Sequence, residues 1–345
     1  ATQHHENNYD SLLTLFPYSP GDFEGQQTTK DSVIYDASYG IEVHDPRSKW
    51  MDNLYLIAGQ AYLYKGDYFN AIAAFKFIIK EKGATDKEGA PEVIGTRGYT
   101  PQEQISVATP ELNKKLFYHL PSRNDAFIWL IRSYIDSGSY DLARNLISTL
   151  NTDPVFPSRL HTPLLTLQAW FYFRQSLVAK GIPFLEKAVD SVRDKRTQAR
   201  WQFLLGQYYQ QDGQWSLAQR HFQEVTGLPA DPMMHFYAYL NMTEMQILEK
   251  KEDFKTGSEP LLAMARKDKY ERYRSIIYYN LGRMALKSSL RDEAITYFRT
   301  SLRYNRDNVS QTLLTTHLLA DTYYAAGRYR DAKRYYDSTA LSMNP

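Results

Sequence analysis

Histidines and paired carboxylates are the residues of this chain that could bind a metal or transfer a proton. The eight histidines are scattered, and the sequence contains no H-E-x-x-H or comparable ligand spacing. His4 and His5 are adjacent, but a flexible terminus is their expected setting. The neighbouring carboxylates Asp292 and Glu293 fall on a predicted helix, where solvated charge is their ordinary role. The pattern therefore predicts no metal, no cofactor and no catalytic residue.

Motifs of known reaction types are missing as well. The sequence has no G-x-S-x-G elbow, no P-loop and no G-x-G-x-x-G, and we interpret the two glycines of "IGTRGYT" as a loop. It also has no cysteine, which excludes disulfides, thiolate catalysis and Cys-ligated zinc. We expect that the chain is not an enzyme.

Charge and composition narrow the class of partner. The 345 residues include 41 basic and 39 acidic side chains, so a formal charge of +2 gives no general attraction for nucleic acid or anionic lipid. No apolar run approaches the roughly 18 to 20 residues that span a bilayer. The 28 Tyr, 16 Phe and 5 Trp suit crossing helices, because large flat side chains fill the gaps between them. These features favour a helical protein with protein partners and no nucleic acid.

A short motif recurs along the chain and predicts how its helices are arranged. In "YKGDYFNAIAAF", Ala71 is followed four residues later by Phe75, and after Ala143 the same small-residue slot returns every 37 to 39 residues. The slot is occupied by Ala71, Ala143, Gly181, Ala218, Gly257, Ala294 and Ala332. This spacing matches the tetratricopeptide pattern W-x2-L-G-x2-Y…A-x3-F. It predicts an all-α, right-handed superhelical solenoid of about seven helix pairs, some of them degenerate.

The predicted pairs divide the chain into an extension and an array. Residues 1–50 are an N-terminal extension with one capping helix over 29–44, and residues 51–345 are the array, with a loop insertion at about 82–112. The pairs are expected at 51–80, 124–151, 162–192, 197–227, 233–268, 274–304 and 312–342. In the third pair, Gly181 and Pro183 should disturb the start of the second helix.

Glycines are expected at two kinds of place within a pair. A small residue on the first helix lets the second approach closely, with the small-residue slot as the matching contact, at Gly59, Gly206 and Gly282. A left-handed cap between the two helices is expected at Gly66, Gly138, Gly213 and Gly327. An aromatic residue then opens the second helix, as Tyr68 does in the first pair.

A solenoid of this kind binds along its concave surface, which the first helix of each pair lines. The residues that should lie there are Leu56, Gln60, Tyr64, Ile128, Arg132, Asp136, Trp170, Arg174, Phe203, Gln207, Gln211, Tyr279, Arg283 and Lys287. Aromatic anchors with arginine donors indicate a peptide groove. The alternative is that the aromatic members pack against neighbouring helices. A carboxylate clamp for chaperone tails is disfavoured, because Leu56 with Gln60 and Ile128 with Arg132 stand where Lys and Asn are needed.

Two longer phrases resemble a known family. They are "IYDASYGIEVHDPRSKWMDNLYLIAGQAYLYKGDYFNAIAAFKFIIK" and "KRTQARWQFLLGQYYQQDGQWSLAQRHFQEV". The first carries a helix ending in a histidine before W-[MVI]-D-[DN]-x-Y, in residues His44, Trp50, Asp52, Asn53 and Tyr55. The second carries R-W/Y-x-F-x-L-x-Q-x-Y, in residues Arg200, Trp201, Phe203, Leu205, Gln207 and Tyr209. Both are similar to the PorW/SprE family, tetratricopeptide lipoproteins of Bacteroidetes.

The resemblance implies a function and a location. It implies a non-enzymatic scaffold of the type IX secretion system, and of gliding motility in gliding species, that links the translocon to ring and motor components. It implies a periplasmic protein held at the outer membrane only through an N-terminal lipid anchor, whose cysteine this chain lacks, and further sequence downstream. Two alternatives stay open: a SusD-like glycan-binding outer-membrane lipoprotein, and a generic tetratricopeptide adaptor.

Overall fold

The computed structural model divides the chain into two compact units, Thr14–Val192 and a second that joins Ala1–Leu13 to Arg193–Pro345. Each is treated by itself below. The residues that the structure describes are 9, 11–17, 27–44, 48, 50–81, 85–86, 90–91, 106–109, 111, 120–248, 253–305 and 308–343. His4, His5 and most of the predicted insertion lie outside them.

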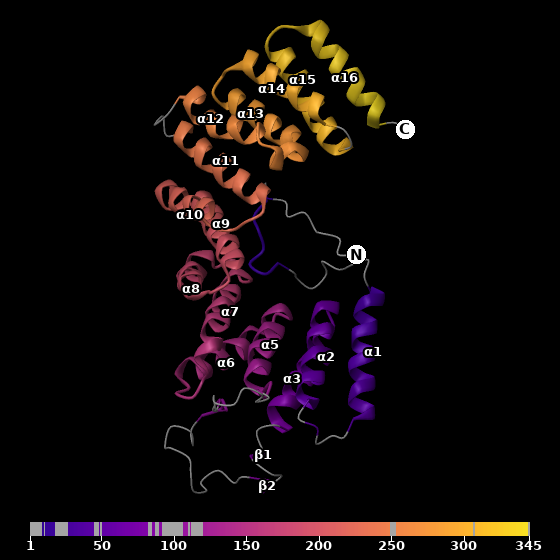
Figure 1. Cartoon of the computed structure of the whole chain (residues 1–345), viewed down its shortest axis with the longest axis vertical. Helices are drawn as coiled ribbons and strands as arrows, with labels where there is room; N and C mark the ends of the chain where they lie inside the picture. The colour runs from indigo at the N-terminus through magenta and orange to yellow at the C-terminus, as the bar shows by residue number, and fades with distance from the viewer. Residues whose placement is uncertain are drawn as a thin grey trace. The chain divides into compact units, whose positions relative to one another are not determined.

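The unit Thr14–Val192 is a row of helices in which neighbours along the chain pack together (Figure 1). Its helices are α1 (Gln27–Val43), α2 (Met51–Lys65), α3 (Tyr68–Glu81), α5 (Arg123–Asp136), α6 (Tyr140–Thr152), the 3-10 turn η1 (Ser158–Leu160), α7 (His161–Phe173) and α8 (Val178–Ser191). The helix α1 packs against α2. Within the predicted insertion, β1 (Thr85–Asp86) pairs antiparallel with β2 (Ala90–Pro91), a contact that the sequence did not predict.

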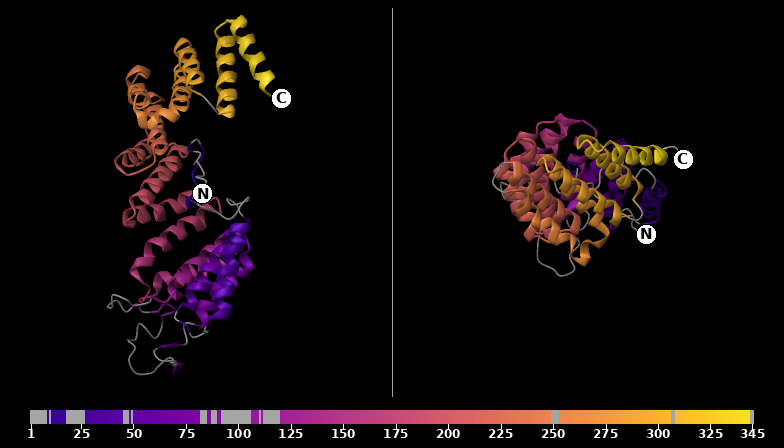
Figure 2. Two further views of the ribbon diagram at one scale, coloured as in Figure 1. Left: turned by 45° about the vertical axis from the view of Figure 1, so that its right-hand side comes forward. Right: turned by 90° about the horizontal axis from the view of Figure 1, so that it is seen from above.

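The second unit continues in the same way. Its helices are α9 (Lys195–Gln211), α10 (Trp215–Gly227), α11 (Pro232–Leu248), α12 (Phe254–Ala265), the 3-10 turn η2 (Asp268–Tyr273), α13 (Arg274–Lys287), α14 (Arg291–Tyr304), α15 (Val309–Ala325) and α16 (Tyr329–Met343). The members of each pair lie side by side, as α15 and α16 show in Figures 1 and 2. Helix pairs thus occupy the predicted places, and the all-α tetratricopeptide fold is confirmed.

Glycines of the first helices lie against phenylalanine rings of the second helices. A Cβ atom on Gly59, Gly206 or Gly282 would come within 2.6, 2.8 or 2.5 Å of the ring of Phe75, Phe222 or Phe298. The sequence analysis assigned the matching contact to the small-residue slot, and the closest neighbour is instead the ring four residues later. Because real Cβ atoms do not approach so closely, the ring is what requires glycine at these positions.

The turns within the pairs use left-handed residues. Four predicted glycine caps have positive φ angles of 84°, 80°, 73° and 73°, at Gly66, Gly138, Gly213 and Gly327. Two further turns place a serine in this region, Ser176 with φ 59° and Ser289 with φ 62°. The glycine prediction is confirmed, and the two serines adopt a conformation that is unfavourable for a residue with a Cβ atom.

Pro183 does not break the third pair. The helix α8 runs through both Gly181 and Pro183, so the expected disturbance of its start is wrong. A Cβ atom on Gly181 would lie 2.5 Å from the ring of Phe173 in the preceding helix. The glycine at this slot therefore provides the close approach that the first helix provides in other pairs.

Candidate functional site

The predicted groove residues lie on the first helices α2, α5, α7, α9 and α13, and differ in exposure. Arg132, Asp136, Phe203 and Gln207 are buried, whereas Arg174, Gln211 and Lys287 are exposed and the other seven are half-buried. Some of them come together around N-terminal residues of the same chain. One such group lies in each unit.

In the unit Thr14–Val192, four predicted residues contact one another, and two of them contact Phe16. We call these four residues the Arg132 cluster (Tyr64, Arg132, Asp136 and Trp170). The guanidinium carbon of Arg132 lies 4.1 Å from the centre of the Phe16 ring and 5.3 Å from that of Tyr64. The Trp170 ring meets Phe16 edge to face at 5.6 Å, and its Nε1 donates to Asp136 Oδ1 at 2.7 Å. The cluster thus offers a cation and aromatic faces to a single apolar side chain.

The helix α5 explains the pairing inside the Arg132 cluster. Arg132 and Asp136 are one turn apart, which brings their side chains together, and Arg132 Nε lies 3.5 Å from Asp136 Oδ2. Only 6% of Arg132 and 8% of Asp136 is exposed. A buried ion pair of this kind is stable only while both partners remain, so the charge of Arg132 stays at the Phe16 ring.

In the second unit, Gln207 of α9 binds the backbone of the N-terminal segment, by which we mean residues 9–13. Its Nε2 donates to the Ser11 carbonyl at 2.8 Å, and its Oε1 accepts the Leu13 amide at 2.9 Å. The Tyr9 carbonyl is 3.5 Å from the same Nε2. Gln207 thus contacts backbone groups of three residues in this segment. Figure 1 shows the indigo trace of this segment beside α9.

Tyr9 contributes the side chain of this contact. Its ring lies 5.4 Å from that of Phe203, edge to face, and 5.8 Å from that of Tyr237 on α11. Its hydroxyl donates to Asp231 Oδ2, while Asp231 Oδ1 accepts the Met234 amide at the start of α11. We call Phe203, Gln207, Asp231 and Tyr237 the α9–α11 face.

The sequence predicted helix residues of both contacts but not the N-terminal residues that they bind. It selected Phe203 and Gln207, but not Asp231 or Tyr237, and it did not place Tyr9 or Phe16 on any helix face. Asp231 stands directly before α11, where an aspartate is a typical helix cap, and this signal could have located it. The early residues lack periodicity, so no pattern pointed to their partners.

The remaining predicted residues form no comparable group. Leu56 and Ile128 pack against the hydrophobic core of their unit. On α13, the Arg283 guanidinium lies 5.8 Å from the Tyr279 ring, and Lys287 makes a 2.9 Å ion pair with Glu244. Partly exposed pairs of this kind contribute little to stability or recognition.

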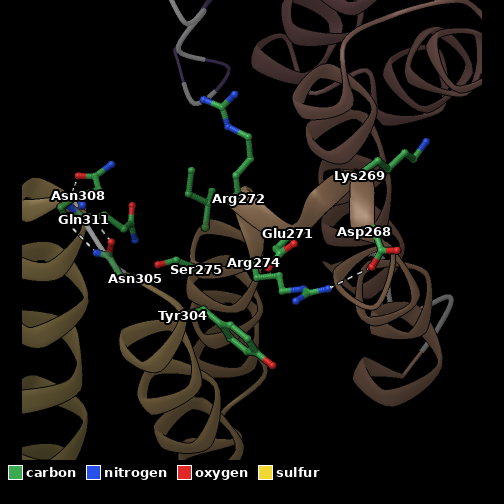
Figure 3. A pocket seen from close by; sticks show the side chains of 11 residues that line it. Asp268, Lys269, Glu271, Arg272, Arg274, Ser275, Tyr304, Asn305, Asn308 and Gln311 are labelled. Carbon is green, nitrogen blue, oxygen red and sulfur yellow. Dashed lines mark hydrogen bonds and ion pairs between the residues drawn. The ribbon is translucent and has the colours of Figure 1, made fainter.

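A hollow of about 530 Å³ lies where η2 meets the ends of α13, α14 and α15. Figure 3 shows that its charged side chains have both signs and that Arg274 reaches towards Asp268, at 3.9 Å. Arg274 Nε also donates to the Ala265 carbonyl at 2.9 Å. Because Arg274 stabilises the end of α12 through this bond, we assign the hollow a structural role.

Two further properties concern the described residues only. They contain no group of three or more His, Asp or Glu side chains that could hold a metal ion. Among their helices, none is both long and apolar enough to cross a membrane.

The sequence and structure are similar to those of known repeat proteins. Residues 276–308, which cover most of α13 and α14, match the family model of the tetratricopeptide repeat. No curated protein matches the chain.

Several solved structures are similar to it. PilF of Pseudomonas aeruginosa is 20% identical over 64% of this chain and 76% of that chain, with a TM-score of 0.29. The apo form of the quorum sensor NprR from B. thuringiensis is 13% identical over 92% and 84%, with a TM-score of 0.46. The APC/C hetero-tetramer Cut9–Hcn1 is 13% identical over 91% of this chain and 50% of that chain, with a TM-score of 0.37.

The matched repeat and the helix-pair fold indicate an interaction scaffold. Tetratricopeptide arrays generally bind protein partners and generally have no catalytic chemistry, because stacked helix pairs present long surfaces to other chains. No specific partner follows from the repeat itself.

Proposed function

We propose that this chain is a scaffold that binds non-helical segments of partner proteins on the faces of its first helices, and that it serves the type IX secretion machinery. In this proposal the protein faces the periplasm, attached to the outer membrane by a lipid anchor, and links the translocon to ring and motor components. Contacts of the described residues support the binding mode. The sequence resemblance supports the assignment to type IX secretion.

The hydrogen bonds of Gln207 carry the proposed binding mode. A glutamine amide has a donor and an acceptor at one end of a rigid group, so it can satisfy a carbonyl and an amide of one peptide backbone together. Gln207 does so with Ser11 and Leu13, at 2.8 and 2.9 Å. Bonds to the backbone supply affinity for many sequences, and neighbouring pockets select side chains.

The Arg132 cluster gives independent support from the other unit. Arg132 and Trp170 contact the ring of Phe16, and Arg132 also lies over the ring of Tyr64. Arginine and aromatic residues dominate the energy of protein interfaces when they enclose an apolar anchor. In each unit, therefore, a first helix holds a non-helical segment through polar and aromatic side chains together.

The type IX assignment is supported by the phrases that resemble the PorW/SprE family. The second phrase contains Phe203 and Gln207, which contact the N-terminal segment. From the first phrase, Asp52 is buried and accepts the Ser122 amide at 2.7 Å, which fixes the start of α5 to α2. Some residues of the two phrases that resemble the family therefore contact the N-terminal segment or position a helix of a proposed binding face.

Interferometry with purified type IX ring and translocon components tests this function. We expect the immobilised chain to bind at least one component with a dissociation constant of about 1 μM or tighter, the range of specific transient complexes. Gln207→Glu should weaken that binding, because it removes the donor. Gln223→Glu, at an exposed glutamine of α10, is the matched control and should leave the binding unchanged.

Three outcomes would contradict parts of the proposal. If the chain binds none of the components, the assignment to type IX secretion is wrong. If Gln207→Glu does not change the binding, the α9–α11 face is not the site. A signal on a glycan array, without any protein partner, would favour the SusD-like alternative.

A further inference from the structure

The α9–α11 face is occupied by the chain's own N-terminal segment. Tyr9 and Leu13 are 5% and 6% exposed, whereas Leu12 between them is 40% exposed. The segment therefore buries two side chains four residues apart and leaves Leu12 between them exposed. This arrangement defines a pattern of tyrosine, three residues, then leucine.

Each inserted position has a chemical reason. The Tyr9 ring lies between the Phe203 and Tyr237 rings, and its hydroxyl reaches Asp231, so this place selects an aromatic side chain with a donor at its end. The Leu13 side chain is buried, so its position favours an apolar residue. Gln207 binds the backbone between them. A phenylalanine at the first position would lose the hydroxyl donor, and a charged residue at the second would be desolvated.

The attachment of the segment is of the kind that can open. The hydrogen bonds described above join it to the side chains of Gln207 and Asp231. Burial of a tyrosine and a leucine favours the bound state, while the conformational entropy lost on ordering the chain opposes it. Segments held in this way open locally without unfolding the domain.

We propose that the α9–α11 face binds a partner segment with a tyrosine followed four residues later by a leucine, and that residues 9–13 compete with it for this face. The inference rests on the proposed function, because it names the chemistry of the partner at that site. The tethered segment acts at a high effective concentration, so a partner binds more weakly than the face alone would allow.

Fluorescence anisotropy of a labelled peptide tests the competition. The probe is NNYDSLLT, the sequence of residues 7–14, added to the full chain. We expect the double variant Tyr9→Ala, Leu13→Ala to bind the probe about tenfold or more tightly than the unchanged chain, because its own segment no longer competes. Adding Gln207→Glu should remove this binding, and Gln223→Glu, at an exposed glutamine of α10, should leave it unchanged. A probe with alanine in place of the exposed leucine should bind equally well, and one with alanine in place of tyrosine should not bind.

Each other result overturns the inference. If the double variant binds no probe at concentrations up to about 1 mM, the face does not take a free segment. If both chains bind equally, the segment is not a competitor, and if Gln207→Glu has no effect, the probe binds elsewhere. A dimeric unchanged chain that becomes monomeric in the double variant would identify a second copy as the occupant.

If the double variant does not fold, the unchanged chain provides a second test. Excess unlabelled probe added to the unchanged chain should raise hydrogen exchange across residues 9–13 by about tenfold, because it displaces them, and no change would overturn the inference. Loss of probe binding while type IX components still bind contradicts this inference alone. Loss of both contradicts the proposed function.

Discussion

Gln207 Oε1 accepts a hydrogen bond from the Leu13 backbone amide at 2.9 Å, although 194 residues separate them in sequence. The same side chain donates to the Ser11 carbonyl. Gln207 therefore binds the backbone of a distant, non-helical segment in the way that it could bind a peptide ligand. This contact is the basis of our proposal that the α9–α11 face is a binding surface and that the N-terminal segment is its first occupant.

The hydroxyl of Tyr9 should contribute measurably to the stability of the folded chain. Tyr9→Phe keeps the ring against Phe203 and removes the hydrogen bond to Asp231. We expect the free energy of unfolding in urea to fall by about 0.5 to 1.5 kcal/mol. Tyr324→Phe, at a tyrosine that is 61% exposed, serves as the control and should change little. Equal values for the two variants would mean that the segment does not stabilise the fold.

Gly206 should not tolerate a methyl group. A Cβ atom there would lie 2.8 Å from the Phe222 ring, in the middle of the α9 and α10 pair. We expect Gly206→Ala to destabilise the chain by about 1 to 3 kcal/mol through overpacking, measured by chemical denaturation. Gly227→Ala is the matched control, because a Cβ atom there meets nothing within 4 Å. A stable Gly206→Ala protein would show that the helices can separate without cost.

Ser289 should prefer to be a glycine. Its φ of 62° is left-handed, and Gly213 holds the equivalent turn position with φ 73°. We expect Ser289→Gly to raise the melting temperature, with a gain of up to about 1 kcal/mol, since glycine has no Cβ penalty in this region.

The reciprocal exchange is the control for that prediction. Gly213→Ser should destabilise by about 1 to 2 kcal/mol, and nothing within 4 Å of its Cβ position would clash. If both exchanges shift the melting temperature in the same direction, backbone conformation is not the cause.

Stability should decrease as the pH falls below about 6.5. The His221 ring is 6% exposed, stacks on Tyr209 at 5.3 Å and lies with Nδ1 2.6 Å from Gln202 Oε1. Burial, followed by the nearby charge of Arg220, lowers the pKa of His221 to about 4 from 6.5. The unfolded chain therefore takes up this proton first, and stability that is present above pH 6.5 is lost as the pH falls towards 4.

Urea titrations at several pH values measure this effect. Each pH unit inside that window should reduce the free energy of unfolding by at most about 1.4 kcal/mol through this histidine. His221→Gln should flatten the profile relative to the unchanged chain. Parallel profiles for the two proteins would assign the pH dependence to other groups.

The helix pairs could be predicted because their pattern is local. The repeat of Ala71 with Phe75, and the glycine caps, depend on neighbours within one or two turns, so spacing alone located all seven pairs. Gly206 was selected correctly as a close contact, but its partner was not, because sequence spacing does not show which side chain of the next helix crosses it. The ring of Phe222 fills that place.

The binding faces could be predicted only from the helix side. Arg132 and Gln207 stand at the positions that a first helix presents, and repeat geometry selected both. Tyr9 and Phe16 lie in residues without periodicity, and their partners are more than 100 residues away in sequence. Such contacts follow from the path of the chain in space, which composition and spacing do not contain.

Hydrogen exchange at the Leu13 amide tests most directly whether the N-terminal segment is a reversible occupant. Our account predicts that this amide exchanges slower than an unprotected amide, because Gln207 accepts its hydrogen bond, but about tenfold or more faster than the Leu205 amide inside α9. Exchange at the unprotected rate would contradict binding. Exchange as slow as that of Leu205 would show that the segment leaves only when the helix unfolds, and would contradict its replacement by a partner.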